Sequence, residues 1–131
     1  MVMYSDRGSA AVEMALVLPV LLAVFLAIAE FGNLMFTRLT LTNAAMMGAR
    51  AGITAVSSPA AIALAQSTAA ASMPDGALAT ATINELPPRR IEVNVSFSYE
   101  PILGSALFSL LKTSGPGTWD LAETAVLSFN N

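Results

Sequence analysis

The chain has 131 residues, of which 55% are hydrophobic and 11% charged, and its formal net charge is −3. This composition is too apolar for an ordinary soluble domain and far too apolar for a disordered one, which favours a membrane protein. Nucleic acid is not an expected partner, because nothing in the chain neutralises a run of phosphates. Without His or Cys, the chain also lacks the residues of Ser-His-Asp and Cys-His triads and of the usual zinc site. We therefore expect no catalytic residue, no cofactor and no metal.

The first predicted element is a long helix over residues 9–52. It contains an uncharged apolar stretch, Met14 to Ala29, which is bounded by Glu13 and Glu30 and measures roughly 24 Å as a helix. With its small and aromatic flanks, over about residues 12–36, this part can cross a bilayer core of roughly 30 Å. Apolar residues then recur mostly at spacings of three or four, so the helix is predicted to continue well beyond the membrane.

Pro19 lies inside the apolar stretch. Proline removes one backbone hydrogen bond and clashes with the preceding turn, although in lipid the freed carbonyls find local substitutes. We therefore expect a helix kink near Pro19. Its role stays open between simple tolerance of proline in a membrane helix and a hinge that acts during assembly.

Residues 53–131 are predicted to form a small α+β head. A proline begins its short helix, a Pro-Asp-Gly turn follows, and the first two strands alternate apolar and polar residues with a period of two, as in an antiparallel hairpin. Three strands need a cover, which the end of the long helix can supply. The predicted elements are a helix over 59–71, strands over 77–85 and 91–99, a third strand or alternatively a helix over 121–129, and a short apolar helix or turn over 102–111.

The N-terminal sequence resembles a known family. The resemblance is carried by Arg7 to Pro19, by Glu30-Phe31-Gly32, and by Leu41 to Ala45 and Gly48 to Gly52. These residues are similar to those of the TadE-like minor pseudopilins of tight-adherence (Tad) pilus systems, within the wider type IV pilin-like class. The resemblance implies a minor pilin that takes part in the initiation, priming or capping of an adhesive pilus, through packing of its N-terminal helix.

A processing site is the first thing that the resemblance implies. Prepilin peptidase would cut between Gly8 and Ser9, which removes a leader of residues 1–8 and makes Glu13 the fifth residue of the mature chain. In a low-dielectric environment, Glu13 can pair with the new ammonium group of an adjacent subunit, although desolvation reduces the gain. The alternative is a solvated carboxylate at headgroup depth.

A second implied site is the segment Glu30, Phe31 and Gly32, as an interface with another subunit or with the pilus assembly platform. Alternatively, Glu30 is a boundary carboxylate that pairs with Arg38 two turns on, through neighbours or water. The resemblance thus implies as partners other pilin-like subunits, prepilin peptidase, the assembly platform and the lipid bilayer. It places the protein in the bacterial inner membrane with an exported head, periplasmic or extracellular. The charges themselves do not set this orientation, because Asp6 offsets Arg7.

Other readings of the same residues lead to different classes of protein. Ala27-Ile28-Ala29 resembles a signal peptidase site, and a cut after Ala29 would release an exported soluble binding domain. An uncut chain would be a single-pass membrane anchor. A membrane-anchored hydrolase would need paired carboxylates, for which Glu92 and Glu100 are the nearest candidates. Both fall on the polar face of the second predicted strand, where solvated charge is the commoner explanation.

Overall fold

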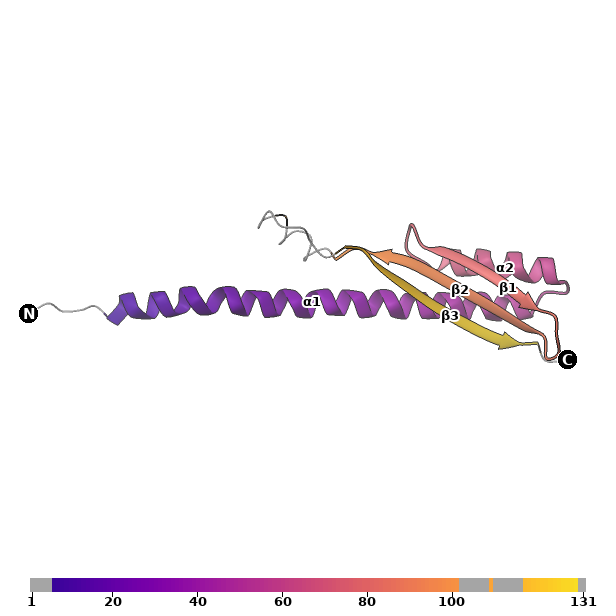
Figure 1. The fold of residues 1–131 in the computed structure, drawn as a ribbon, viewed down its shortest axis with the longest axis horizontal. Helices are drawn as coiled ribbons and strands as arrows, with labels where there is room; N and C mark the ends of the chain where they lie inside the picture. Colours follow the sequence, from indigo (N-terminus) through magenta and orange to yellow (C-terminus); the bar gives the residue numbers. More distant parts are fainter. Residues whose placement is uncertain (1–5, 102–108, 110–116, 130–131) are drawn as a thin grey trace, which may run out of the picture.

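The computed structural model describes residues 6–101, 109 and 117–129, which form a long rod with a small head along its second half (Figure 1). The architecture is the α+β arrangement expected from the sequence, with a long helix, a short helix and a three-stranded antiparallel sheet. The elements are α1 (Asp6–Ile53), α2 (Ser58–Ala71), β1 (Leu78–Asn84), β2 (Arg90–Tyr99) and β3 (Trp119–Ser128).

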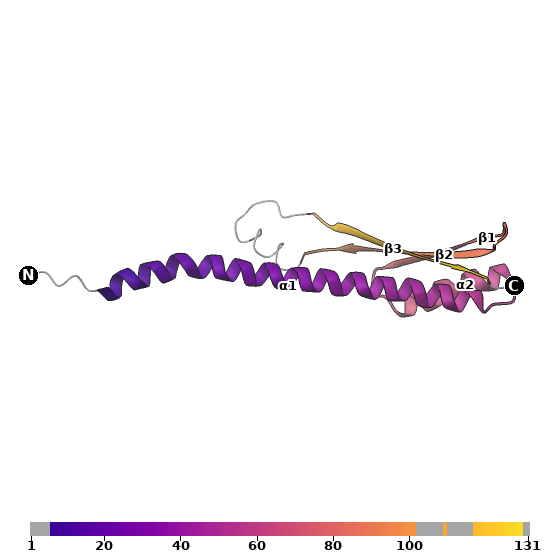
Figure 2. The ribbon, with the colours of Figure 1, turned by 90° about the horizontal axis from the view of Figure 1, so that it is seen from below.

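Helix α1 is one uninterrupted helix of 48 residues, about 72 Å long at about 1.5 Å per residue. Pro19 lies inside it, and the ribbon bows gently in its N-terminal half (Figure 2). The hydroxyls of Thr37, Thr40 and Thr42 each donate a hydrogen bond to the backbone carbonyl four residues earlier, so these polar side chains are satisfied within the helix. Because the helix includes Pro19 and runs on to Ile53, it passes through the proline without a break and continues into the head.

The two halves of α1 have different surroundings. In the first half, nearly all the large apolar side chains from Val12 to Phe31 are more than half exposed. In the second half, one face is buried, and Leu41, Ala45 and Ala49 on that face are at most 1% exposed. The first half of α1 is thus apolar on all sides and uncovered in the monomer, whereas the second half is amphipathic and packs on the core of the head.

Helices α1 and α2 pack closely because both carry small residues at intervals of four. Gly48 and Gly52 of α1 meet Ala61, Ala65 and Ala69 of α2, and these three alanines are fully buried. A Cβ at position 48 would lie 2.7 Å from the Ala65 carbonyl oxygen and 3.0 Å from the Ala69 Cβ. The approach of the two backbones therefore requires glycine at this position.

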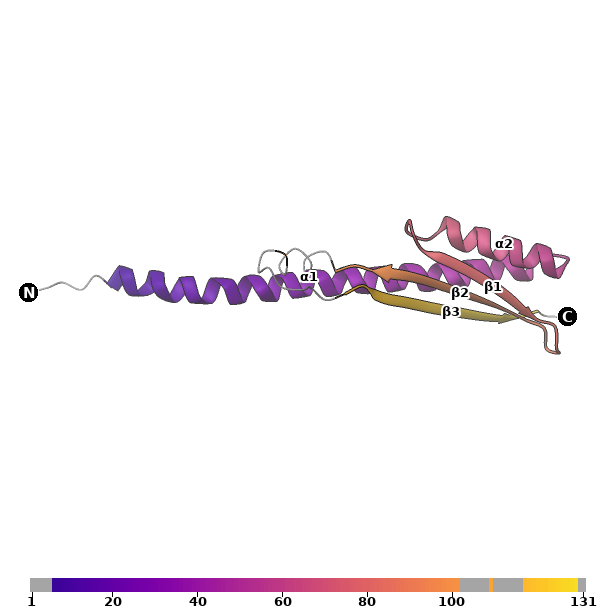
Figure 3. The same cartoon turned by 45° about the horizontal axis from the view of Figure 1, so that its top comes forward.

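Strand β2 is the centre of the sheet, with β1 and β3 antiparallel on its two sides. Ala81 of β1 is the partner of Val93, and Val93 is in turn the partner of Ala125 of β3. Helix α1 contacts β2 and β3, and α2 contacts β1, so both helices cover the same face of the sheet (Figure 3). The side chains of β2 that point to this face and are buried are Ile91, Val93, Val95 and Tyr99, which confirms the predicted period of two.

Arg89 contacts several segments at the end of the head that lies beside the C-terminal end of α1. Its Nη2 donates a hydrogen bond to Ser58 Oγ at 2.8 Å, and its Nε lies 2.9 Å from Glu85 Oε2, an ion pair without hydrogen-bond geometry. Its guanidinium lies over the ring of Phe129, 4.6 Å from the centroid. These contacts join the start of α2, the β1–β2 connection and the segment that follows β3.

The predicted elements agree with the observed ones within about two residues at most ends, apart from the start of the long helix, which the structure places at Asp6. The leader expected over residues 1–8 therefore overlaps the first turn of α1. The short helix or turn predicted over 102–111 lies outside the described residues, apart from Ser109.

Candidate functional site

Within the described part of the chain, α1 is the helix that is long and apolar enough to cross a membrane. None of the residues in its most apolar window is buried in the monomer, so lipid or other protein chains are needed to cover it. A hydrocarbon core of about 30 Å takes up about 20 helical residues, which from Glu13 reaches to Asn33. Glu13 and Glu30, about 25 Å apart along the axis, then lie near the two boundaries of the membrane.

A polar contact joins the C-terminal end of this segment to the head. The Tyr99 hydroxyl, at the end of β2, donates a hydrogen bond to Glu30 Oε1 at 2.8 Å and accepts one from Asn33 Nδ2 at 3.1 Å. Glu30 and Asn33 are three residues apart and so share one face of α1. Tyr99 is only 3% exposed. The end of the sheet is therefore fastened to the helix at the level where the membrane boundary is expected.

The environment of Tyr99 raises the pKa of its hydroxyl. Burial raises the pKa of the Tyr99 hydroxyl above 10.0, and the hydrogen bond to Glu30 and the charge of that carboxylate raise this pKa further, against an opposing effect of Asn33. Like any tyrosine, Tyr99 is protonated at neutral pH, and the raised pKa extends to higher pH the range in which its hydroxyl can donate to Glu30.

An apolar recess of about 230 Å³ lies beside this contact. Trp119 begins β3 and is the cross-strand partner of Tyr99. Trp119 is 47% exposed and Phe31 is 63% exposed, so large aromatic surface remains uncovered here. The residues that line the recess are Ala27, Glu30, Phe31, Leu34 and Trp119. Aromatic side chains from the helix and from the sheet thus gather at the same level of α1.

The residues of the predicted processing site lie at the other end of the helix. Gly8, Ser9 and Glu13 are all exposed, and Glu13 is about 25 Å from Glu30 along the axis. A Cβ at Gly8 would have no heavy atom within 4 Å, and the same holds at Gly32. The packing of the described chain therefore requires glycine at neither position, in contrast to Gly48.

The three residues of the predicted interface, Glu30, Phe31 and Gly32, differ in exposure. Glu30 is turned toward the head and bonded to Tyr99, whereas Phe31 and Gly32 are exposed. Arg38, the partner considered from the sequence, is eight residues further on, about 12 Å along the axis.

Sequence reasoning did not find Tyr99, Asn33 or Trp119 as members of this junction. The usable signal was present, because Tyr99 continues the buried face of the second predicted strand toward its end. What the sequence lacks is the placement of that strand end beside Glu30, which lies 69 residues earlier in the chain.

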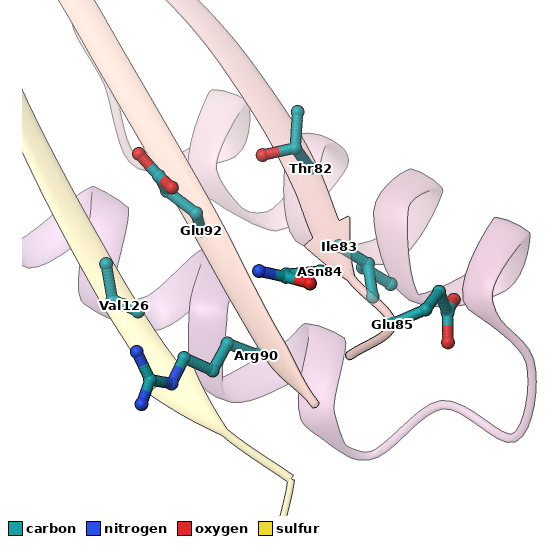
Figure 4. A pocket seen from close by; sticks show the side chains of 7 residues that line it. All are labelled: Thr82, Ile83, Asn84, Glu85, Arg90, Glu92 and Val126. Carbon is teal, nitrogen blue, oxygen red and sulfur yellow. The ribbon is translucent and has the colours of Figure 1, made fainter. Parts of the chain in front are cut away.

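A second recess, of about 460 Å³, lies on the face of the sheet away from the helices, which appear behind the sheet in Figure 4. Its lining includes Glu85, Arg90 and Glu92. No group of three or more His, Cys, Asp or Glu residues in the described ranges could hold a metal ion. Glu92 and Glu100 are about 26 Å apart along an extended strand, so they do not form the pair of carboxylates that hydrolysis would need.

In the part of the chain that the structure describes, the fold and the junction define a helix suited to cross a membrane and a head that is hydrogen-bonded to the C-terminal end of that apolar segment. Residues 8–50 match the sequence model of the TadE-like protein family. The chain thus carries a TadE-like N-terminal segment, as its resemblance indicated, and the family points to a protein associated with the Tad pilus. No curated protein and no solved structure matches the chain. The match covers α1 almost to its end and leaves α2 and the sheet outside it.

Proposed function

We propose that this protein is a minor pilin-like component that takes part in assembly of a Tad-type pilus through its N-terminal helix. The observation that carries the proposal is the uncovered apolar half of α1 in a chain whose residues 8–50 are TadE-like. Before assembly, this half of the helix lies in the inner membrane with the head exported. During assembly it packs against equivalent helices of other subunits, which exchanges lipid for protein without exposing apolar surface to water.

Processing by prepilin peptidase between Gly8 and Ser9 belongs to this proposal. The exposed position of Gly8 supports it, because a Cβ there would meet no heavy atom within 4 Å and the fold has no need of glycine at this residue. The new ammonium group of Ser9 then pairs with Glu13 of a neighbouring subunit. Glu13 is exposed in the monomer and is available for such a pair.

The exposed part of the predicted interface is proposed to contact another subunit or the assembly platform. Phe31 and Gly32 are exposed at the outer end of the membrane segment. Glu30 supports this contact indirectly, because its bond to Tyr99 holds the head in a set position beside them. In this arrangement the protein initiates, primes or caps a filament of a separate major pilin.

An uncut single-pass membrane anchor is the second candidate. The start of α1 at Asp6 favours it, because the predicted cut between Gly8 and Ser9 then lies inside the first turns of a helix. Release of the head by a cut after Ala29 has less support, because α1 runs unbroken through Ala27-Ile28-Ala29 and the peptidase would have to unwind it.

The mature N-terminus, measured by mass spectrometry on protein from the native host, distinguishes these candidates. A pilin-like precursor yields Ser9, a secreted domain yields Glu30, and an uncut anchor yields Met1 or Val2. We expect Ser9 in the wild type and the unprocessed chain in Gly8→Ala. Gly32→Ala is the matched control, because it also adds one methyl group at an open position of α1, and it should be processed normally. If the mass of Gly8→Ala still fell by the mass of the leader, the assigned site would be wrong.

A further inference from the structure

The apolar recess beside Glu30 lies at a defined depth relative to the membrane. Ala27 and Phe31 lie in the last two turns of the segment that about 30 Å of hydrocarbon would cover from Glu13 onward, and Leu34 is the first residue past it. Trp119 lines the same recess, so the sheet brings this side chain against the part of the helix that reaches the lipid boundary. The uncovered aromatic surface is therefore continuous with the lipid-facing surface of α1.

The side chains at this level have the chemistry of a membrane interface. Tryptophan and tyrosine gather there because each has an apolar ring with a polar group that reaches water or headgroups. Trp119 keeps 47% of its surface exposed although it is the largest side chain in the junction. Glu100, which follows the end of β2 at Tyr99, and Asp120, which follows Trp119 in β3, are exposed acids, and these negative charges favour zwitterionic over anionic headgroups.

A chain of contacts joins Trp119 to the membrane helix. Trp119 and Tyr99 are cross-strand partners, so the sheet sets the position of one relative to the other. The Tyr99 hydroxyl is in turn bonded to Glu30 of α1. The position of Trp119 relative to the helix is thus supported by the packing of β2 and β3 on α1 and, at this end of the sheet, by the hydrogen bonds of the Tyr99 hydroxyl to Glu30 and Asn33.

We infer that the head rests on the bilayer itself, with Trp119 in the outer interfacial layer of zwitterionic lipid and the Tyr99–Glu30 contact as the latch that holds it there. The inference rests on the membrane insertion of α1 that is part of the proposed function. It adds a lipid-binding surface at the junction and gives the Tyr99 hydroxyl a positioning role.

The chain carries its own probe for this inference, because Trp119 is its one tryptophan. The full chain is reconstituted at high dilution in phosphatidylcholine vesicles, and quenching of its fluorescence is measured with brominated lipids and with acrylamide. We expect a blue-shifted emission, stronger quenching by lipids brominated high in the acyl chain than by lipids brominated near its end, and little quenching by acrylamide.

Two variants test the latch. Tyr99→Phe removes the hydroxyl and keeps the ring, and we expect it to lower quenching by the shallow bromolipid and to raise quenching by acrylamide. Ser98→Ala is the control, because it removes the 2.7 Å hydrogen bond to Asp120 at the same end of the sheet but on its outer face. It should leave both readings unchanged. Circular dichroism checks that both variants are folded, and the wild-type reading decides the depth of Trp119 without either variant.

Alkaline extraction separates failure of this inference from failure of the proposed function. If the chain resists extraction but the brominated lipids do not quench Trp119, the head does not rest on lipid and the inference is wrong. The inference is also wrong if acrylamide quenches Trp119 weakly only at high protein-to-lipid ratios. In that case a second protein chain, and not lipid, covers the residue. If the chain is itself extracted, α1 is not inserted and the proposed function fails as well.

Discussion

Tyr99 is the residue at which the membrane segment and the head meet. Its ring continues the buried face of β2, and its hydroxyl bonds to two side chains of α1. A tyrosine suits this position because the ring can pack on an apolar core while the hydroxyl reaches a carboxylate at the edge. Phenylalanine would keep the packing and lose the connection to Glu30.

The protonation of Tyr99 provides a test at the residue scale. Because burial and Glu30 raise the folded-state pKa above 10.0, this group stabilises the fold below that pH, and the contribution is lost as pH rises through the folded-state pKa. In a Tyr4→Phe background, the tyrosinate absorbance of Tyr99 should titrate with a midpoint above 10.0. Glu30→Gln should move this midpoint back toward 10.0, because it removes the charge and leaves an acceptor. A wild-type midpoint at or below the ordinary value would contradict the contact.

At the scale of elements, the two halves of α1 have different surroundings. Its first half is apolar on all sides, as a helix surrounded by lipid or by other helices must be, and its second half is apolar on one face only. The change occurs near Leu34, which packs partly against the core of the head. One continuous helix thus joins the apolar half of α1 to the core of the head.

The packing of α1 on α2 gives a prediction at this scale. Gly48→Ala places a methyl group 2.7 Å from the Ala65 carbonyl oxygen, a backbone atom that cannot move without shifting α2. We expect it to lower the free energy of unfolding of the head by about 1–3 kcal/mol, as overpacking generally does. Gly32→Ala in the same helix meets no neighbour and should stabilise the helix by about 0.5–1 kcal/mol.

Thermal unfolding in detergent micelles, followed by circular dichroism, compares the two glycine variants. The expected result is a lower midpoint for Gly48→Ala and an equal or higher midpoint for Gly32→Ala. Equal shifts in one direction would mean that α2 does not approach α1 at Gly48 as closely as the structure shows.

At the scale of the whole molecule, the proposed pairing of Glu13 would link the monomer to an assembly. Glu13 is exposed in the monomer, and the proposal gives it a partner in a neighbouring subunit. Removing one member of a buried ion pair costs about 3–5 kcal/mol, because the other charge is left unpaired. We therefore expect Glu13→Ala and Glu13→Gln to insert into the membrane normally but to reduce pilus formation strongly, as measured by membrane fractionation and electron microscopy. Normal numbers of pili in both variants would remove the pairing proposal.

Most of the fold was predictable because its signals are local. The alternation of Ile91, Val93 and Val95 with polar residues indicates a strand without knowledge of its neighbours, and the structure confirms it. The long helix and its apolar half were equally readable from spacing and composition. The candidate site was predicted only in part, because Glu30 was recognised as unusual but its partner was sought along the helix and in other subunits.

The sequence by itself determined the elements, the exposed apolar half of α1 and the TadE-like character of residues 8–50, since periodicity, composition and motifs are properties of contiguous residues. Only the tertiary structure decided that Tyr99 binds Glu30, that Trp119 lies beside Phe31, and that Gly48 is required by α2. Each of these contacts joins segments separated in the chain, and it exists only because the sheet and α2 are packed on α1 in one register.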